Sequence, residues 1–170
     1  NGNIGKKMLI KQGYNSKKII EGPALRQKLN HSNNLNKSGI LLVCPYEYET
    51  ACESIYKLNS ALIKLRNNSI KVQVKAHPMM NKYDILKRLP DNSLPEGWSW
   101  NNSDIDDALK SKYCCIILAS AGIFDAILSN CIVINMQREF SGMGNFSDFM
   151  QDKFPVLKEV SHINLSNRIK

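Results

Sequence analysis

The chain has 170 residues, of which 23 are lysine or arginine and 15 are aspartate or glutamate, so its formal net charge is +8. This length allows one domain, and a content of 43% apolar and 22% charged residues excludes the disordered class. The longest apolar runs have about six residues, far fewer than the roughly 18–20 that a membrane-spanning helix needs. The positive charge favours an anionic ligand. Because the basic residues are scattered, we expect no nucleic-acid partner.

The first part of the chain differs in composition from the rest. Residues 1–38 are polar, with one strand-like stub at Lys18-Ile19-Ile20 and an asparagine-rich stretch, which is typical of loops and linkers. We therefore expect residues 1–38 to be a linker or appendage from a preceding N-terminal domain, residues 39–160 to form the core domain, and residues 161–170 to be a tail. The five cysteines are odd in number and form no CxxC pair, which predicts that the protein is located in the reducing cytoplasm.

From residue 39 onward, strand patterns alternate with helix patterns. Residues 40–44 form a continuous apolar run, which is typical of a strand buried on both faces of a parallel sheet. Similar runs, or period-two alternation, predict strands at 70–75, 113–119 and 131–136, with a short strand between 91 and 102. Apolar spacing predicts a helix that Thr50 caps, a short helix over 81–88, a brief one through Leu109 that Asn102 or Ser103 caps, and one over 123–128. The expected fold class is α/β, a doubly wound and mostly parallel sheet.

Polar residues follow each of the main expected strands. In a doubly wound sheet the ligand crevice lies beyond the carboxyl ends of the strands, so these residues should meet at one edge. The four clusters are Pro45-Tyr46-Glu47, Lys75-Ala76-His77-Pro78, Ser120-Ala121-Gly122 and Gln137-Arg138-Glu139. Gly142-Met143-Gly144 follows no strand closely and is expected to be a flexible connection.

The turn Ser120-Ala121-Gly122 opens the helix expected over 123–128 and is a candidate phosphate site. Small residues let a phosphate approach the backbone N–H groups at the positive end of a helix, and the Ser120 hydroxyl adds a donor. The alternative is that Ser120 only caps a helix packed closely on the sheet. Asp125, one turn further on, either meets a ribose hydroxyl or simply favours the helix start.

His77 is the candidate catalytic residue. Held by Pro78 at the tip of a strand, it could donate to a phosphate oxygen, or as imidazolium neutralise or protonate a leaving phosphate. Lys75 points to the same side of the strand and could support a diphosphate. The alternatives are an ordinary turn histidine and a solvated lysine. No spacing indicates metal ligands, and we expect no cofactor. The absence of GxxxxGK[ST] and of GxGxxG after the first strand argues against a P-loop kinase and an NAD enzyme.

The motif order Leu41-Leu42-Val43-Cys44-Pro45, Val74-Lys75-Ala76-His77-Pro78, Ile117 to Ile127 and Val133-Ile134 resembles the C-terminal, Rossmann-like nucleotide-binding half of GT-B glycosyltransferases. This order of motifs is most similar to that of bacterial surface-carbohydrate biosynthesis proteins. In similar enzymes with cytidine-nucleotide donors, a K-x-H-P strand end and a hydroxyl-bearing turn hold the donor phosphates. His77 and Ser120 match those motifs, with Lys75 alongside. The segment Gly22-Pro23-Ala24-Leu25-Arg26 looks like the point where the chain leaves the N-terminal half.

The chain departs from that pattern in three places. It has Ala119-Ser120-Ala121 where two adjacent hydroxyl residues are common, Asp125 where many relatives carry glutamate, and Asn130-Cys131 in place of the usual Gly-Pro before the last strand.

The resemblance implies a glycosyltransferase domain that binds a nucleotide sugar, with a CMP- or CDP-linked donor favoured and a saccharide or lipid-linked acceptor. Because a GT-B enzyme needs two such domains, the chain by itself is expected to be inactive. It is expected in the cytoplasm, with peripheral association at the inner face of the membrane. The alternatives are a CDP-glycerol-type glycerophosphotransferase domain, a non-catalytic Rossmann-like binding or scaffolding module, and a UDP-sugar epimerase.

Overall fold

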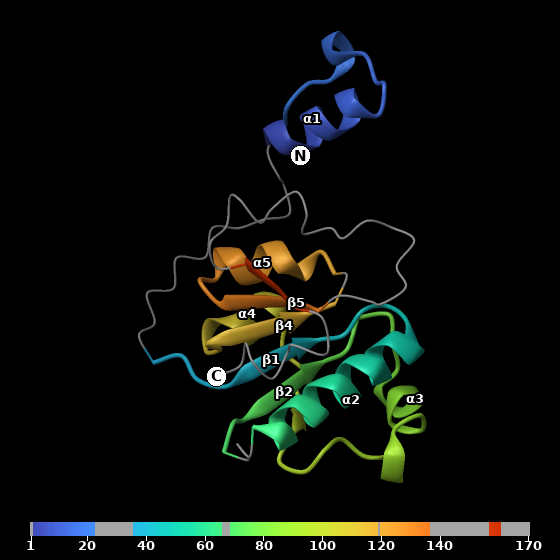
Figure 1. Ribbon diagram of the computed structural model, residues 1–170, viewed down its shortest axis with the longest axis vertical. Coiled ribbons are helices and arrows are strands. Elements are labelled where there is room, and N and C mark those ends of the chain that lie inside the picture. The colour runs from blue at the N-terminus through green and yellow to red at the C-terminus, as the bar shows by residue number, and fades with distance from the viewer. Residues whose placement is uncertain (1, 23–35, 66–68, 119, 137–156, 161–170) are drawn as a thin grey trace.

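A parallel β-sheet with helices on both faces forms the body of the protein, in a computed structural model that describes residues 2–22, 36–65, 69–118, 120–136 and 157–160 (Figure 1). The sheet has six strands in the order β3-β2-β1-β4-β5-β6, and every neighbouring pair is parallel. The predicted fold class, a doubly wound Rossmann-like α/β sheet, is therefore confirmed. Four predicted pieces lie outside the described residues: the segment from Pro23 to Arg26, the polar cluster at 137–139, the connection at 142–144 and the tail at 161–170.

β1 (Ile40–Val43) is the centre of the sheet and pairs with both β2 (Val72–Lys75) and β4 (Cys114–Ile117). All four β1 side chains are buried, and they alternate between two apolar clusters. Ile40 and Leu42 pack in the cluster that contains α2 (Tyr48–Lys64), whereas Leu41 and Val43 pack with residues of α4 (Ile105–Lys110) and α5 (Gly122–Leu128). This two-sided burial is what the continuous apolar run of β1 predicted.

The chain first builds one wing of the sheet and then crosses to the other. After β1, α2 leads to β2, and α3 (Lys82–Leu86) and η2 (Pro90–Asn92) lead to β3 (Ser99–Trp100) at the sheet edge. The chain then returns through α4 to β4 on the far side of β1, and α5, β5 (Ile132–Met136) and β6 (Leu157–Val160) complete the second wing. The connections after β1 therefore lead toward one edge of the sheet, and those after β4 lead toward the other. The boundary between β1 and β4 is the topological switch point, where ligands bind in such sheets.

Two helix caps differ from the sequence prediction. α2 begins at Tyr48 with Glu47 as its N-cap, so Thr50 lies inside the first turn, where its buried hydroxyl donates to the Glu47 carboxylate. α4 has Asp104 as its N-cap rather than Asn102 or Ser103. The hydroxyl and amide of Ser103 instead bond to the Asn101 side chain. Short polar side chains often bond locally in this way, which competes with capping.

The strand-like stub predicted at Lys18-Ile19-Ile20 is wrong. The segment before residue 23 contains a helix, α1 (Gly2–Lys11), and a single turn of 3-10 helix, η1 (Ser16–Lys18). The Asn15 side chain accepts the Lys17 N–H at 2.9 Å. This bond starts the turn and removes Lys18 from extended geometry.

Asn130 shows how one departure from the family pattern is accommodated. Its φ of +54° lies in the left-handed region, which glycine adopts freely and asparagine tolerates better than most residues. An asparagine therefore fits the turn before β5, where the resemblance leads one to expect a Gly-Pro pair.

Among the described residues, no helix has the length and apolar content that a bilayer crossing requires.

We predict that Gly39→Ala strongly destabilises the fold. A Cβ at Gly39 would lie 2.6 Å from the backbone oxygen of Lys71, and its φ is +72°, so a backbone clash adds to left-handed strain. Gly97 is a matched control, since its φ is +76° but a Cβ there would meet nothing within 4 Å. In urea denaturation, Gly97→Ala should lower the free energy of unfolding by about 1–2 kcal/mol. Gly39→Ala should lower it by about 1–3 kcal/mol more, and equal losses would contradict this account.

Candidate functional site

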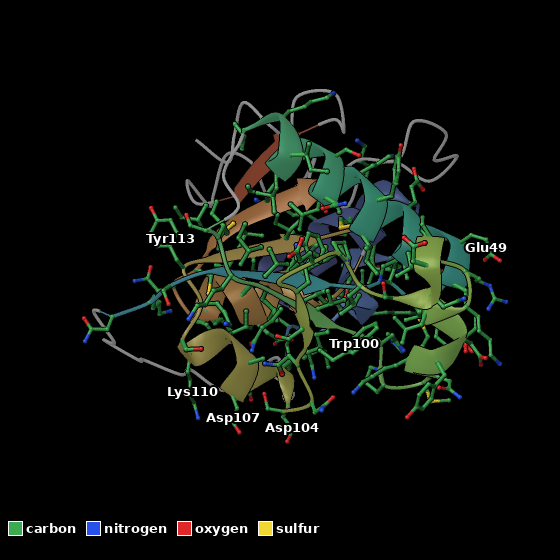
Figure 2. The ribbon with its side chains drawn as sticks, turned by 90° about the horizontal axis from the view of Figure 1, so that it is seen from below. Glu49, Trp100, Asp104, Asp107, Lys110 and Tyr113 are labelled. Carbon is green, nitrogen blue, oxygen red and sulfur yellow. The ribbon has the colours of Figure 1, made fainter. Side chains whose placement is uncertain are left out.

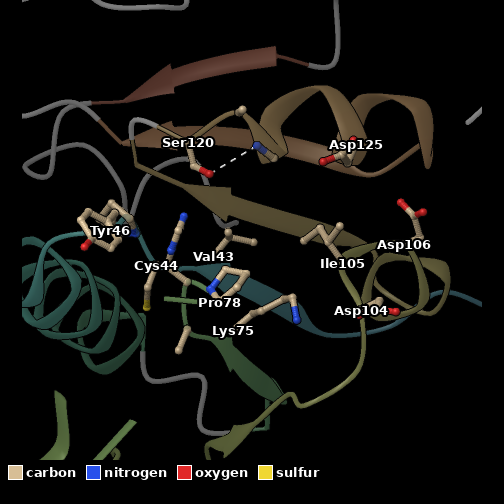
Figure 3. Close-up of a pocket in the computed structure, with 15 residues that line it drawn as sticks. Val43, Cys44, Tyr46, Lys75, Pro78, Asp104, Ile105, Asp106, Ser120 and Asp125 are labelled. Carbon is tan, nitrogen blue, oxygen red and sulfur yellow. Dashed lines mark hydrogen bonds between the residues drawn. The ribbon is translucent and has the colours of Figure 1, made fainter. Parts of the chain in front are cut away.

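An open cavity of about 750 Å³ lies at the carboxyl ends of β1, β2 and β4 (Figure 3). This volume is within the range of small-molecule sites, roughly 300–1,000 Å³. Nine residues that the sequence singled out line the cavity, whereas Glu47 of the first cluster does not and the cluster at 137–139 lies outside the described residues. The nine are Pro45, Tyr46, Lys75, His77, Pro78, Ser120, Ala121, Gly122 and Asp125. The ends of three strands thus contribute to one site at the switch point.

The Ser120 turn holds its hydroxyl next to the start of α5. The Ser120 Oγ accepts the Gly122 N–H at 3.3 Å (Figure 3), and the Ser120 carbonyl accepts the Ile123 N–H, also at 3.3 Å. The Phe124 N–H donates to the Ala121 carbonyl at 3.2 Å. The first three N–H groups of α5 are therefore already bonded within the protein. These three groups therefore do not form the backbone cradle that the sequence suggested, and the Ser120 hydroxyl proton remains as a donor for a ligand.

His77 is held by a turn of its own. Its carbonyl accepts the Met80 N–H at 2.9 Å, and Pro78 occupies the second position of this turn, where its fixed φ is favourable. The His77 Nδ1 atom accepts the Met79 N–H at 3.2 Å. The Tyr46 ring meets the imidazole edge to face, with centroids 5.1 Å apart and planes at 70°. The backbone turn and the tyrosine thus fix the ring at the cavity wall.

Lys75 is tied to the loop that precedes α4. Its ammonium donates to the Ser103 carbonyl, and partial burial lowers its pKa from the ordinary value. Of its charged neighbours, Asp104 opposes that shift and Lys82 adds to it. An ammonium has three donors, so one bond to Ser103 leaves others for a ligand. Lys75 therefore both anchors this wall of the cavity and adds positive charge to it.

The structure adds two carboxylates that sequence reasoning missed. Asp104 and Asp106, at the start of α4, line the cavity together with Asp125, and all three lie at one end of it, away from Tyr46 (Figure 3). Asp107 instead pairs with Lys110 on the outside of α4, where both side chains are visible in Figure 2. The other site residues were identified because polar residues directly follow an expected strand. For β3, the sequence predicted a short strand between 91 and 102 without placing its end, so the polar residues after it were not recognised.

Cys44 lies in the cavity wall but is not a nucleophile. Its side chain is fully buried, and burial raises the pKa of its thiol to about 12, with a smaller contribution from Cys52. The thiolate, which is the reactive form, is therefore scarce at neutral pH. All five cysteines of the chain are free thiols.

No group of three or more His, Cys, Asp or Glu side chains in the described part of the chain is arranged to hold a metal ion.

No protein-family model matches this chain, and no curated protein matches it either. The cavity itself therefore carries the functional argument, together with the motifs that line it.

We predict that native protein exposes a single reactive thiol. Burial raises the pKa of all five thiols, to about 12 for Cys114 and well above the usual value for Cys115, but Cys52 is only partly buried and therefore accessible to a reagent. Cys131 is fully buried and donates its thiol proton to the Lys112 carbonyl at 3.2 Å. Labelling with a chromogenic disulfide at pH 8 should give one thiol in the native state and five in guanidinium. Cys52→Ser should abolish the native signal, and labelling of Cys44, identified by peptide mass, would contradict the prediction.

Proposed function

We propose that the protein is the nucleotide-sugar-binding domain of a glycosyltransferase, as the resemblance of its motifs implies. One observation carries the proposal: His77 and Ser120, which leave the sheet from separate strands, line the same cavity at the switch point. In the proposal, the phosphate oxygens of a nucleotide accept hydrogen bonds from both groups. The non-catalytic alternative required a pocket filled by side chains with His77 turned away, and the open cavity that His77 lines disfavours it.

The charge distribution of the cavity suggests how a donor would lie. The phosphates would meet the donors of Ser120 and His77, whereas Asp104, Asp106 and Asp125 repel an anion and accept bonds from hydroxyl groups. Ribose or sugar hydroxyls therefore suit the carboxylate end. A cytidine nucleotide is the favoured donor because the resemblance is to enzymes that use one. A donor of glycerophosphate would use the same phosphate site, so nucleotide binding is the first test of both transferase hypotheses.

In this proposal, catalysis depends on stabilising the leaving phosphate. When the bond between the sugar carbon and the phosphate oxygen breaks, negative charge grows on that oxygen. Hydrogen bonds from preorganised donors then strengthen, and each is worth on the order of 2–4 kcal/mol in the transition state. A saccharide or lipid-linked acceptor, at the inner face of a membrane, completes the proposed reaction.

We predict that CMP, CDP or UDP binds to this cavity, with a cytidine nucleotide bound most tightly. His77→Ala and Ser120→Ala should each weaken binding about 10–100-fold, because each removes a hydrogen bond to a charged group worth about 1.5–3 kcal/mol. Isothermal titration calorimetry measures the affinities. Ser93→Ala is the control, since Ser93 is exposed and does not line the cavity. Equal affinities for all four proteins would contradict the proposal.

A second prediction concerns Asp125. If its carboxylate accepts from the ribose, a 2′-deoxynucleotide should bind the wild-type protein about 10-fold more weakly than the ribonucleotide. In Asp125→Ala this difference should disappear, because the hydroxyl has lost its acceptor. The four affinities form a double-mutant cycle between protein and ligand. A deoxy penalty that persists in Asp125→Ala would assign Asp125 to the helix start alone.

A further inference from the structure

His77 and Ser120 share a local geometry although they follow different strands. In each, one polar atom of the side chain accepts the backbone N–H of the residue two positions later. His77 Nδ1 accepts from Met79 at 3.2 Å, and Ser120 Oγ accepts from Gly122 at 3.3 Å. Both side chains are therefore fixed by the turn that follows them.

This bond determines which proton each side chain can offer. A ring nitrogen that accepts a hydrogen bond carries no proton, so a neutral His77 has its proton on Nε2. To become an imidazolium, the ring would need a proton on Nδ1, which would face the Met79 N–H and break the bond. The Ser120 oxygen likewise keeps one proton to donate. Each residue thus has one donor remaining after its local bond is made.

We propose that His77 and Ser120 recognise phosphate as a pair of neutral, single hydrogen-bond donors, Nε2–H and Oγ–H, each oriented by the backbone N–H two residues on. The inference deepens the proposed function and rests on it for the identity of the ligand. It selects one of the roles that the sequence left open for His77: the imidazole stabilises the leaving phosphate as a donor and does not protonate it. Pro78 and Met79 act here as positioning residues.

The carboxylates at the other end of the cavity support a neutral donor pair. Asp104, Asp106 and Asp125 make the lining acidic, with Lys75 as the opposing cation, and the Lys75 ammonium is bonded to the Ser103 carbonyl. Among the described residues that line the cavity, Lys75 is the cation, so these residues do not form the cluster of cations on which a charge-driven phosphate site depends. Raising the salt concentration screens attraction to cations and repulsion from carboxylates alike. Nucleotide affinity should accordingly change by less than about threefold between 50 and 500 mM salt.

The chain itself supplies the design of the key variant. Asn15, Asn81 and Asn101 each accept the N–H of the residue two positions later, at 2.9, 3.0 and 3.1 Å. His77→Asn can therefore keep the bond to Met79 and the turn, while it removes the donor at the position of Nε2. His77→Gln places a neutral amide donor near that position. Ser120→Thr retains the hydroxyl, which Ser120→Ala removes.

The test combines spectroscopy on the full chain with nucleotide titrations. Nitrogen-15 NMR of the histidine side chains, with the His77 signals assigned by their loss in His77→Gln, should show a protonated Nε2 and an unprotonated Nδ1, both free and with CMP bound. His77→Asn should lose about 10–100-fold in CMP affinity, whereas His77→Gln and Ser120→Thr should remain within about 10-fold of wild type.

Two results would overturn the inference: an imidazolium at His77 in the CMP complex, or a His77→Gln variant that binds CMP as weakly as His77→Asn. Circular dichroism of each variant checks that it folds. If the wild-type protein binds none of CMP, CDP and UDP, the proposed function fails. The tautomer of free His77 then still decides the local part of the inference, because its measurement needs no ligand.

Discussion

The parallel pairing of β1 with both β2 and β4 is the constraint on which the rest of the structure depends. It buries β1 on both faces and at both edges, so its sequence must be continuously apolar. It also sends the chain to opposite sides of β1 in the two halves of the sheet, which leaves space above the ends of the strands. The cavity is a product of this topology. The residues that line it come from the ends of the strands, the turns that follow them and the starts of α4 and α5.

The cavity separates donors from acceptors. Ser120 and His77 offer protons from the turns after β4 and β2, while the carboxylates come mainly from the start of α4. Lys75 joins the two parts, because it leaves β2 and bonds to the loop before α4. A ligand with an anionic group at one end and hydroxyl groups at the other would match this division. A nucleotide is such a ligand, since its phosphates and its ribose are covalently joined.

Strand ends were the part of the site that could be predicted from the sequence. An apolar run that stops at a proline or a small residue marks where a buried strand emerges, and His77 and Ser120 were found in this way. Asp104 and Asp106 were not, because the short strand predicted between 91 and 102 had no defined end and Asn102 or Ser103 was interpreted as a helix cap. Capping by Ser120 was one of two alternatives, but that Ala121 is the N-cap and that both residues accept bonds from the first turn of α5 could not be predicted. These bonds depend on distances of a few tenths of an ångström, which residue types do not encode.

The shortness of β3 has a consequence for the behaviour of the protein in concentrated solution. A strand at the end of a sheet presents unpaired N–H and C=O groups that can recruit a strand from another molecule. β3 ends the described sheet with only two residues and is followed at once by Asn101, whose side chain bonds back to Gln73 at 2.9 Å. Such a short edge gives an incoming strand few positions to pair with. This border of the sheet is thereby protected against aggregation through intermolecular β-structure.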